Sequence, residues 1–214
     1  MGVPAVFVRL AECNLACAWC DTKYTWDWAN HDRSRETLEL AVSAVADEVV
    51  AQCHGRIGTV VVTGGEPLLQ QPALAELAEL LHHRGLRIEV ETNGAIAPSA
   101  QLAPHIDQWN VSPKLANSGN ALSARIRAIA LDWFANCETA TFKFVVAEPS
   151  DLDEIDQLVG QLALPRDRVL VMPQAVDAAT VVDKTRWLAR ECAQRGFRLT
   201  TRLHVLLWGA TRGR

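Results

Sequence analysis

Three cysteines near the N-terminus offer the most distinctive chemistry in the sequence. Cys13, Cys17 and Cys20 have a C-x3-C-x2-C spacing, so three thiolates can reach one metal centre. Thiolates are soft ligands that select iron–sulfur clusters, zinc or copper. A structural zinc site takes four protein ligands, and the nearest candidate for the fourth is His31, 11 residues after Cys20. A [4Fe–4S] cluster held by three cysteines leaves one iron open to another ligand, and the spacing favours this cluster.

Composition and charge narrow the class of protein. The chain has 214 residues, of which 49% are hydrophobic and 21% charged, as in ordinary globular proteins. Its net charge of -4 gives no reason to expect a nucleic acid or an anionic membrane as partner, so we expect a small ligand. The sequence has no apolar run long enough for a membrane span and no export signal, which predicts a cytoplasmic protein.

Apolar, strand-like runs alternate with helical patterns along the whole chain, which predicts an α/β fold with a parallel sheet. Helices are expected where apolar residues recur at a spacing of three to four. The expected strands are 5–10, 59–62, 86–90, 108–111, 141–146, 169–172 and 197–203, and the expected helices are 35–53, 71–84, 121–136, 151–162 and 178–195.

Unusual residues fall where these strands end. Thr63, Glu91, Ser112 and Met172 all follow strand cores. Active sites of parallel barrels gather at the carboxyl ends of the strands, which favours a partial (β/α) barrel with helices outside. A doubly wound sheet with a crevice at its switch point also fits this pattern.

Short motifs accompany the strand ends. Adjacent glycines in Thr63-Gly64-Gly65-Glu66-Pro67 let the backbone approach a ligand closely. The other motifs are Glu91-Thr92-Asn93-Gly94, Ser112-Pro113-Lys114, Cys20-Asp21-Thr22 with the Trp-rich 23–28 stretch after it, and 201–209, which reads TRLHVLLWG.

The cysteine motif, with the aromatic Trp19 before its last cysteine, resembles the signature of the radical S-adenosylmethionine (SAM) superfamily. The remaining motifs are similar to those of the 7-carboxy-7-deazaguanine synthases within it. The resemblance implies a cluster, SAM and Mg²⁺ as cofactors. It also implies cluster ligands Cys13, Cys17 and Cys20, a Mg²⁺ ligand at Thr22, SAM contacts from Trp19, Gly64, Gly65, Glu66, Asn93, Ser112, Pro113, Lys114 and Gln174, and substrate contacts from Arg9, Thr63, Glu91 and His204.

What the resemblance implies about activity is specific. A deoxyadenosyl radical would start the ring contraction of 6-carboxy-5,6,7,8-tetrahydropterin to 7-carboxy-7-deazaguanine with loss of ammonia, in 7-deazapurine (queuosine-type) biosynthesis. A flavodoxin or ferredoxin would supply the electron, and the protein would be a homodimer. The alternatives are a radical SAM enzyme that activates a glycyl-radical protein, and a non-enzymatic zinc module with His31 as the fourth ligand.

The sequence departs from the family pattern in two places. Residues 1–214 read as a single radical SAM domain, but the family's additional N-terminal strand and its Gln-Gly-Glu-Gly substrate loop are not found before Gly2. Glu12 also stands directly before the first cysteine, where the family usually has glycine. A carboxylate beside the cluster is expected to lower its reduction potential.

Overall fold

The computed structural model describes residues 2–209 and 211. Its centre is a sheet of seven parallel strands that follow one another in chain order, so each crossover moves the chain one strand along the sheet. The strands are β1 (Val6–Leu10), β2 (Thr59–Gly64), β3 (Arg87–Thr92), β4 (Gln108–Val111), β5 (Ala140–Val146), β6 (Val169–Pro173) and β7 (Arg198–Leu199).

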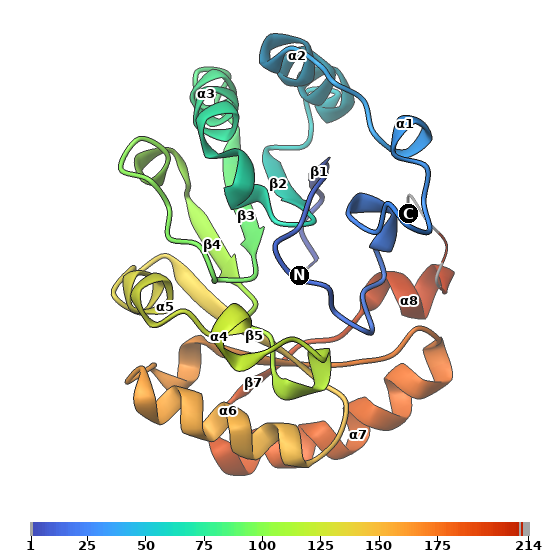
Figure 1. The fold of residues 1–214 in the computed structure, drawn as a ribbon, viewed down its shortest axis with the longest axis vertical. Helices are drawn as coiled ribbons and strands as arrows, with labels where there is room; N and C mark the ends of the chain where they lie inside the picture. The colour runs from blue at the N-terminus through green and yellow to red at the C-terminus, as the bar shows by residue number, and fades with distance from the viewer. Residues whose placement is uncertain (1, 210, 212–214) are drawn as a thin grey trace.

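The longer helices lie on the outside of the curved sheet, as Figure 1 shows. β1 and β7 are the two edges of the sheet and do not pair, so the arc stays open as an incomplete barrel. The predicted partial barrel is confirmed. The helices are α1 (Arg33–Glu36), α2 (Val42–Cys53), α3 (Gln71–His82), α4 (Leu122–Arg125), α5 (Ala128–Ala135), α6 (Ser150–Gln161), α7 (Ala178–Arg195) and α8 (Leu203–Trp208).

The two faces of the sheet differ in polarity because successive side chains of a strand point to opposite faces. Val60, Val62, Ile88, Val90 and Phe142 are fully buried against the helices in the hydrophobic core. Burying each such side chain contributes about 1.5–3 kcal/mol relative to leaving it in water. Fold stability is therefore concentrated on the outer face, which leaves the inner face free to carry polar groups.

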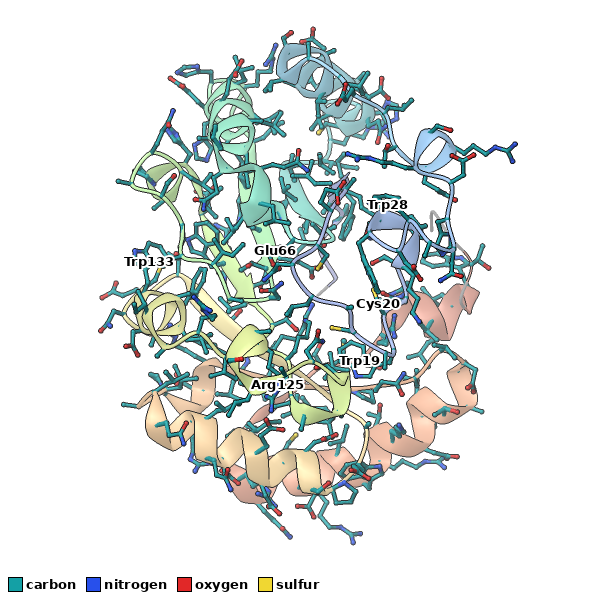
Figure 2. The ribbon with its side chains drawn as sticks, viewed as in Figure 1. Trp19, Cys20, Trp28, Glu66, Arg125 and Trp133 are labelled. Atoms are coloured by element: carbon teal, nitrogen blue, oxygen red, sulfur yellow. The ribbon has the colours of Figure 1, made fainter. Side chains whose placement is uncertain are left out.

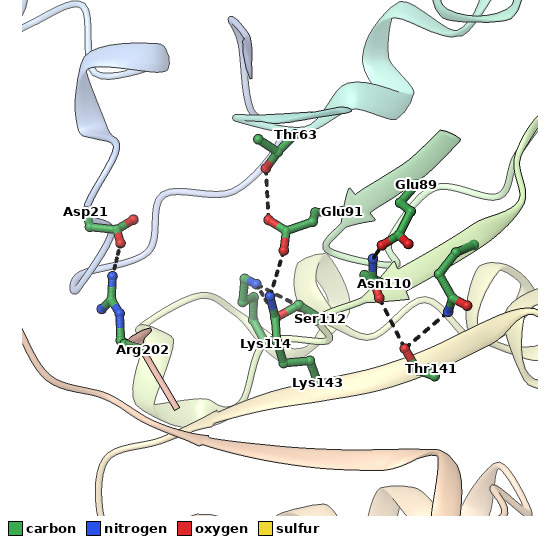
Figure 3. Close-up of polar contacts among 11 residues, drawn as sticks. Asp21, Thr63, Glu89, Glu91, Asn110, Ser112, Lys114, Thr141, Lys143 and Arg202 are labelled. Atoms are coloured by element: carbon green, nitrogen blue, oxygen red, sulfur yellow. Dashed lines mark hydrogen bonds and ion pairs between the residues drawn. The ribbon is translucent and has the colours of Figure 1, made fainter. Parts of the chain in front are cut away.

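The inner face carries a hydrogen-bonded row of polar side chains. Asn110 Nδ2 donates to Glu89 Oε2 at 3.1 Å, and Thr141 Oγ1 donates to Asn110 Oδ1 at 3.3 Å, which links β3, β4 and β5 across the sheet (Figure 3). A buried polar group is costly unless it is hydrogen-bonded. The row therefore makes a polar inner wall compatible with a folded barrel.

Two of the predicted helices are interrupted. The expected helix 35–53 is interrupted after Glu36, because Thr37 is extended with φ −128° and its hydroxyl donates to the Arg33 carbonyl, and it resumes as α2 at Val42. Leu38 and Leu40, whose spacing suggested a helix, are 83% and 60% exposed. The expected helix 121–136 breaks at Ile126, which is extended as well.

The last predicted strand, 197–203, is wrong beyond Leu199. Arg202 is buried and donates from Nη1 to the Ala175 carbonyl at 2.8 Å, and its Nη2 contacts Asp21. These contacts turn the chain, and α8 begins at the next residue. His204 therefore lies on a helix instead of the predicted strand.

In the part of the chain that the structure describes, we find no helix with the length and apolar character needed to span a membrane.

Candidate functional site

The cysteine loop leaves β1 and crosses the open mouth of the barrel, where Figure 2 shows Trp19 and Cys20. Two backbone hydrogen bonds join the loop to the turn after β2: Gly65 N–H donates to the Leu10 carbonyl at 2.9 Å, and Glu66 N–H donates to the Glu12 carbonyl at 2.8 Å. On its other side, Ala18 N–H donates to the Ser118 carbonyl at 2.9 Å. The loop is thus fixed between two distant segments.

The adjacent glycines after β2 are required by this close approach. A Cβ atom at Gly65 would lie 2.0 Å from the Glu12 carbonyl oxygen, and one at Gly64 would lie 2.1 Å from the Leu10 carbonyl oxygen. Gly64 also has a φ of +155°, which L side chains rarely adopt. Any side chain here would push the cysteine loop away, so the glycines set the position of the cysteines.

The three cysteines of the loop are free thiols close enough for their charges to interact. Burial raises the pKa of Cys13 to about 11, although a hydrogen bond from Leu15 opposes the shift, and burial also raises the pKa of Cys17. A coordinating metal deprotonates a thiol outright. Without metal the thiols of Cys13 and Cys17 would therefore stay protonated at neutral pH, and the three free cysteines fit a thiolate-bound cluster.

Among the described side chains, no group of three or more His, Cys, Asp or Glu residues is arranged to hold a single metal ion.

The buried side chain of Glu66 connects the turn after β2 to the end of β3. Figure 2 shows it near the centre of the barrel mouth. Its carboxylate accepts hydrogen bonds from Leu68 N–H at 3.0 Å, Thr92 Oγ1 at 2.8 Å and Asn93 N–H at 2.7 Å. Burial raises the pKa of Glu66, and these three bonds offset part of the rise. Since a carboxylate offers about four acceptor positions, most of this side chain is committed to holding the ends of β2 and β3 together.

A second group of predicted residues surrounds the cysteine loop. Asn93 Nδ2 donates to Asn14 Oδ1 at 2.7 Å. Lys114 Nζ donates to the Ser112 carbonyl at 2.8 Å and lies 5.9 Å from the centre of the Trp19 ring. Burial lowers the pKa of Lys114, against the opposing effect of the Cys17 charge. These side chains form one polar and aromatic border around the three cysteines.

Two further predicted residues, Pro113 and Gln174, follow β4 and β6. Pro113 is buried. Gln174 is half-buried and donates its backbone N–H to the Val146 carbonyl at 2.8 Å.

Glu91 on β3 lies on the inner face between one partner from the adjacent β2 and one from β5, which is two strands away. Thr63 Oγ1 donates to its Oε2 at 3.1 Å, and Lys143 Nζ donates to its Oε1 at 2.9 Å (Figure 3). Burial raises the pKa of Glu91, but Lys143, Thr63 and the Arg9 charge outweigh it, so the pKa lies below its ordinary value. The carboxylate is therefore ionised at neutral pH.

Two further predicted residues belong to the same region. Arg9 is exposed and pairs in register with Thr63 at the carboxyl end of β1. His204 at the start of α8 feels the charges of Glu91 and Lys143. His204 is exposed, but partial desolvation of its ring and the Arg202 charge lower its pKa, so the ring is neutral at neutral pH.

Lys143 was missed by sequence reasoning. Its signal was a single lysine between two phenylalanines, in a strand whose neighbours are otherwise apolar. Lys143 alternates with the buried Phe142 and Phe144, so its side chain must point to the inner face. A cation facing a polar barrel interior is a functional candidate.

Thr22 follows the last cysteine, and its Oγ1 lies 3.6 Å from Cys20 Sγ. A threonine hydroxyl at this position is an oxygen ligand of the kind that Mg²⁺ accepts alongside waters and substrate oxygens. The Asp21 carboxylate beside it pairs with Arg202 (Figure 3), which ties this part of the loop to the start of α8.

Glu12 shows why glycine is favoured before the first cysteine. Its φ is +73°, in the left-handed region that costs a side chain energy and glycine none. Its carboxylate is clamped by Trp28 Nε1 at 3.2 Å and by Arg33 Nη2 at 3.0 Å. The glutamate therefore fastens the Trp-rich segment to the cysteine loop at a conformational cost.

Comparison with known proteins identifies the family. Residues 9–111 match the model of the radical SAM superfamily. The chain is 40% identical to a 7-carboxy-7-deazaguanine synthase of Pyrobaculum aerophilum, over 100% of this chain and 90% of that protein. It is 31% identical to the synthase of Escherichia coli strain K12, over 96% of this chain and 90% of that protein.

Solved structures agree with this relationship. The crystal structure of QueE from Escherichia coli superimposes with a TM-score of 0.67 at 27% identity and covers 94% of this chain and 86% of that one. Streptococcus suis SuiB bound to S-adenosylmethionine, at 13% identity with a TM-score of 0.64, covers 94% of this chain and 51% of that one and shares the fold. The superfamily uses a [4Fe–4S] cluster and SAM, which the free cysteine triplet in its loop fits. This chain belongs to the 7-carboxy-7-deazaguanine synthase family of radical SAM enzymes.

Proposed function

We propose that the protein converts 6-carboxy-5,6,7,8-tetrahydropterin into 7-carboxy-7-deazaguanine with release of ammonia, a step toward queuosine-type 7-deazapurines. The observation that carries the proposal is the charged group on the inner face, where Glu91 lies between Thr63 and Lys143 with Arg9 nearby. Paired charges of both signs suit a substrate that has a carboxylate at one end and hydrogen-bond donors at the other.

The cofactors have a proposed place beside this group. Cys13, Cys17 and Cys20 hold the cluster, and SAM lies along the border formed by Trp19, Gly64, Gly65, Glu66, Asn93, Ser112, Pro113, Lys114 and Gln174. When bound, the cluster and SAM together supply the organic radical that starts the reaction. The tight contact of the Gly64–Gly65 turn with the cysteine loop supports a fixed relation between the two cofactor sites.

The substrate-binding roles follow from charge. Arg9 holds the substrate carboxylate, since a guanidinium binds carboxylates through two parallel hydrogen bonds. Glu91 accepts hydrogen bonds from the donor-rich edge of the pterin, and Thr63 and Lys143 fix the orientation of its carboxylate. The neutral ring of His204 contacts the substrate from α8, and Thr22 offers its hydroxyl to a Mg²⁺ that the substrate shares.

The proposed reaction is balanced without a further reagent. Product and substrate differ only by one ammonia, so no net oxidant or reductant is consumed in turnover. The residues on the inner face therefore have only to bind, orient and keep water out. Binding, orienting and excluding water are especially important when SAM is regenerated in every turnover, because water or a misplaced substrate could consume the radical.

The proposal also covers the domain organisation, electron donor, cellular location and oligomeric state of the protein. The unbroken sheet from β1 to β7 supports a single domain. A flavodoxin or ferredoxin donates the electron, and the protein works in the cytoplasm as a homodimer. The exposed apolar side chains of Leu203, Leu207 and Trp208 on α8 support an association between subunits.

Turnover of the pterin tests the proposal. The protein is loaded with iron and sulfide without oxygen, reduced with dithionite and incubated with SAM, Mg²⁺ and the carboxytetrahydropterin. We expect 7-carboxy-7-deazaguanine by mass spectrometry, and none from Cys17→Ala. Cleavage of SAM without any deazaguanine would instead favour activation of a glycyl-radical protein.

A further inference from the structure

Two side-chain N–H groups donate to the sulfurs of the cysteine triplet. Asn120 Nδ2 lies 3.3 Å from Cys17 Sγ, and Trp26 Nε1 lies 3.3 Å from Cys20 Sγ. Asn120 comes from the segment after β4, about a hundred residues from its cysteine in the chain, whereas Trp26 follows the cysteine loop directly. Two unrelated parts of the chain thus place a donor on a thiol.

The orientation of the Asn120 amide is fixed by its other contacts. Its Oδ1 accepts a hydrogen bond from Ala16 N–H at 3.0 Å, so the NH₂ end must be the one that faces Cys17. That NH₂ group also donates to Ser118 Oγ at 3.2 Å. The donor is therefore held in place from both ends of the amide and cannot turn its oxygen to the sulfur.

The direction of the hydrogen bond between Trp26 and Cys20 is also fixed. An indole N–H can only donate, and the backbone N–H of Trp26 is tied to the Lys23 carbonyl at 3.0 Å in the turn that closes the short helix Lys23–Thr25. The side chain is half-buried. The third cysteine, Cys13, receives its hydrogen bond from the backbone of Leu15. Among the described residues, the hydrogen bonds to these sulfurs that depend on a particular side chain are therefore those to Cys17 and Cys20.

Donors to cluster sulfurs act on the reduction potential. Reduction adds one negative charge to the cluster and its thiolates, and an N–H dipole pointing at a sulfur stabilises that charge. The effect is larger in a partly buried site, where the local dielectric constant is low. Hydrogen bonds to sulfur are among the factors that set the potentials of iron–sulfur clusters over their wide range.

We propose that Asn120 and Trp26 are positioning residues that raise the reduction potential of the cluster through their hydrogen bonds to Cys17 and Cys20. The inference rests on the proposed cluster ligands and is independent of the substrate. The carboxylate of Glu12 before Cys13 is paired with Arg33 at 3.0 Å. Its charge stays compensated whether or not Trp28 also donates to it, so the Trp28 indole N–H is not expected to change the potential.

A redox titration of the reconstituted holoenzyme tests this, with the reduced cluster measured by electron paramagnetic resonance and the iron content determined in parallel. The variants are Trp26→Phe and Asn120→Leu, which remove the donors, and the double variant. Trp28→Phe is the matched control, because it removes an indole N–H from the same segment that donates to Glu12 instead of to sulfur.

At the wild-type midpoint potential, we expect each single variant to lower the ratio of reduced to oxidised cluster about threefold and the double variant about tenfold. For a one-electron couple, tenfold corresponds to about 59 mV. Trp28→Phe should stay at the wild-type value. The inference is overturned if Trp26→Phe and Asn120→Leu keep a full complement of iron and have the same midpoint potential as the wild type and the control.

Failure of the proposed cluster site looks different. A wild-type protein that takes up no iron and gives no resonance signal would refute the cluster ligands themselves. If Asn120→Leu does not fold, the midpoint potentials of Trp26→Phe and Trp28→Phe still test the inference. Each variant loses one indole N–H from the same segment, but only the Trp26 indole donates to a cysteine sulfur.

Discussion

Lys143 Nζ donates to Glu91 Oε1 at 2.9 Å, an ion pair that joins β5 to β3 across the intervening β4. The two side chains are 24% and 36% exposed, so the pair faces the open barrel while solvent still reaches it. An ion pair that lies over a middle strand needs both groups on the inner face. It therefore marks the place where a polar substrate would meet fixed charges.

Replacing Lys143 should weaken substrate binding. In Lys143→Met the Glu91 carboxylate loses its charged partner, and hydrogen bonds to charged groups contribute about 1.5–3 kcal/mol, which corresponds to a rise in KM of roughly 10- to 100-fold. Cluster content and SAM binding should be unchanged. Lys143→Arg keeps a positive charge and should recover part of the affinity. An unchanged KM in Lys143→Met would contradict the role given to this pair.

The pH dependence of substrate binding should move with the same residue. The pKa of Glu91 lies below its ordinary value in the folded protein, so its ion pair is fully present above pH 4.5 and is lost as the pH falls through the lowered pKa. Removing Lys143 removes a lowering influence, so burial should then raise the pKa of Glu91. Substrate dissociation constants measured from pH 5 to 8 should worsen at a higher pH in Lys143→Met than in the wild type. If the dissociation constants of the wild type and Lys143→Met rise at the same pH on acidification, the prediction is contradicted.

Glu12 gives a prediction about stability. Glu12→Ala loses the contacts with Trp28 and Arg33 and keeps the unfavourable φ, whereas Glu12→Gly loses the contacts and the conformational cost together. A left-handed residue costs about 1–2 kcal/mol relative to glycine. A chain of this length gains about 2–4 °C in Tm per kcal/mol. We expect the cluster-loaded Glu12→Gly to melt at least that far above Glu12→Ala in calorimetry, and an equal or lower Tm would refute the account of this position.

Alanine substitutions of the cysteines should affect iron content only at the three positions in the loop after β1. Single changes to alanine at Cys13, Cys17 or Cys20 should abolish the iron and sulfide content and the visible absorption of the reconstituted protein, because each removes one of the three thiolates proposed to hold the cluster. Cys137→Ala is the matched control, since that thiol is half-buried near Thr139 and away from the loop. Full iron content in any of the three loop variants would show that another residue is a ligand.

Sequence reasoning was most successful where local signals decide the structure. The helix predicted for 178–195 has the same bounds as α7, because the Asp177 side chain caps its first turn and Gly196 takes the left-handed conformation after its end. The strand cores were also found, since buried parallel strands read as continuous apolar runs. Unusual residues at strand ends favoured the partial barrel, whereas the strand order that excludes a doubly wound sheet came from the structure.

Interactions between distant residues could not be read from the sequence. Helix α8 replaced a predicted strand because buried Arg202 is held by Asp21 and Ala175, which are remote in the chain. Lys143 and Asn120 escaped notice for the same reason: their partners, Glu91 and Cys17, are 52 and 103 positions away. Periodicity and motif spacing carry no information about such contacts.

The stoichiometry of turnover tests the central claim most directly. The reduced, cluster-loaded protein is given a small amount of SAM and an excess of 6-carboxy-5,6,7,8-tetrahydropterin with Mg²⁺, and deazaguanine, ammonia and remaining SAM are quantified together. We predict more 7-carboxy-7-deazaguanine than the SAM supplied, one ammonia for each product and recovery of the SAM. Protein with full cluster content that binds SAM but forms no deazaguanine would contradict the account.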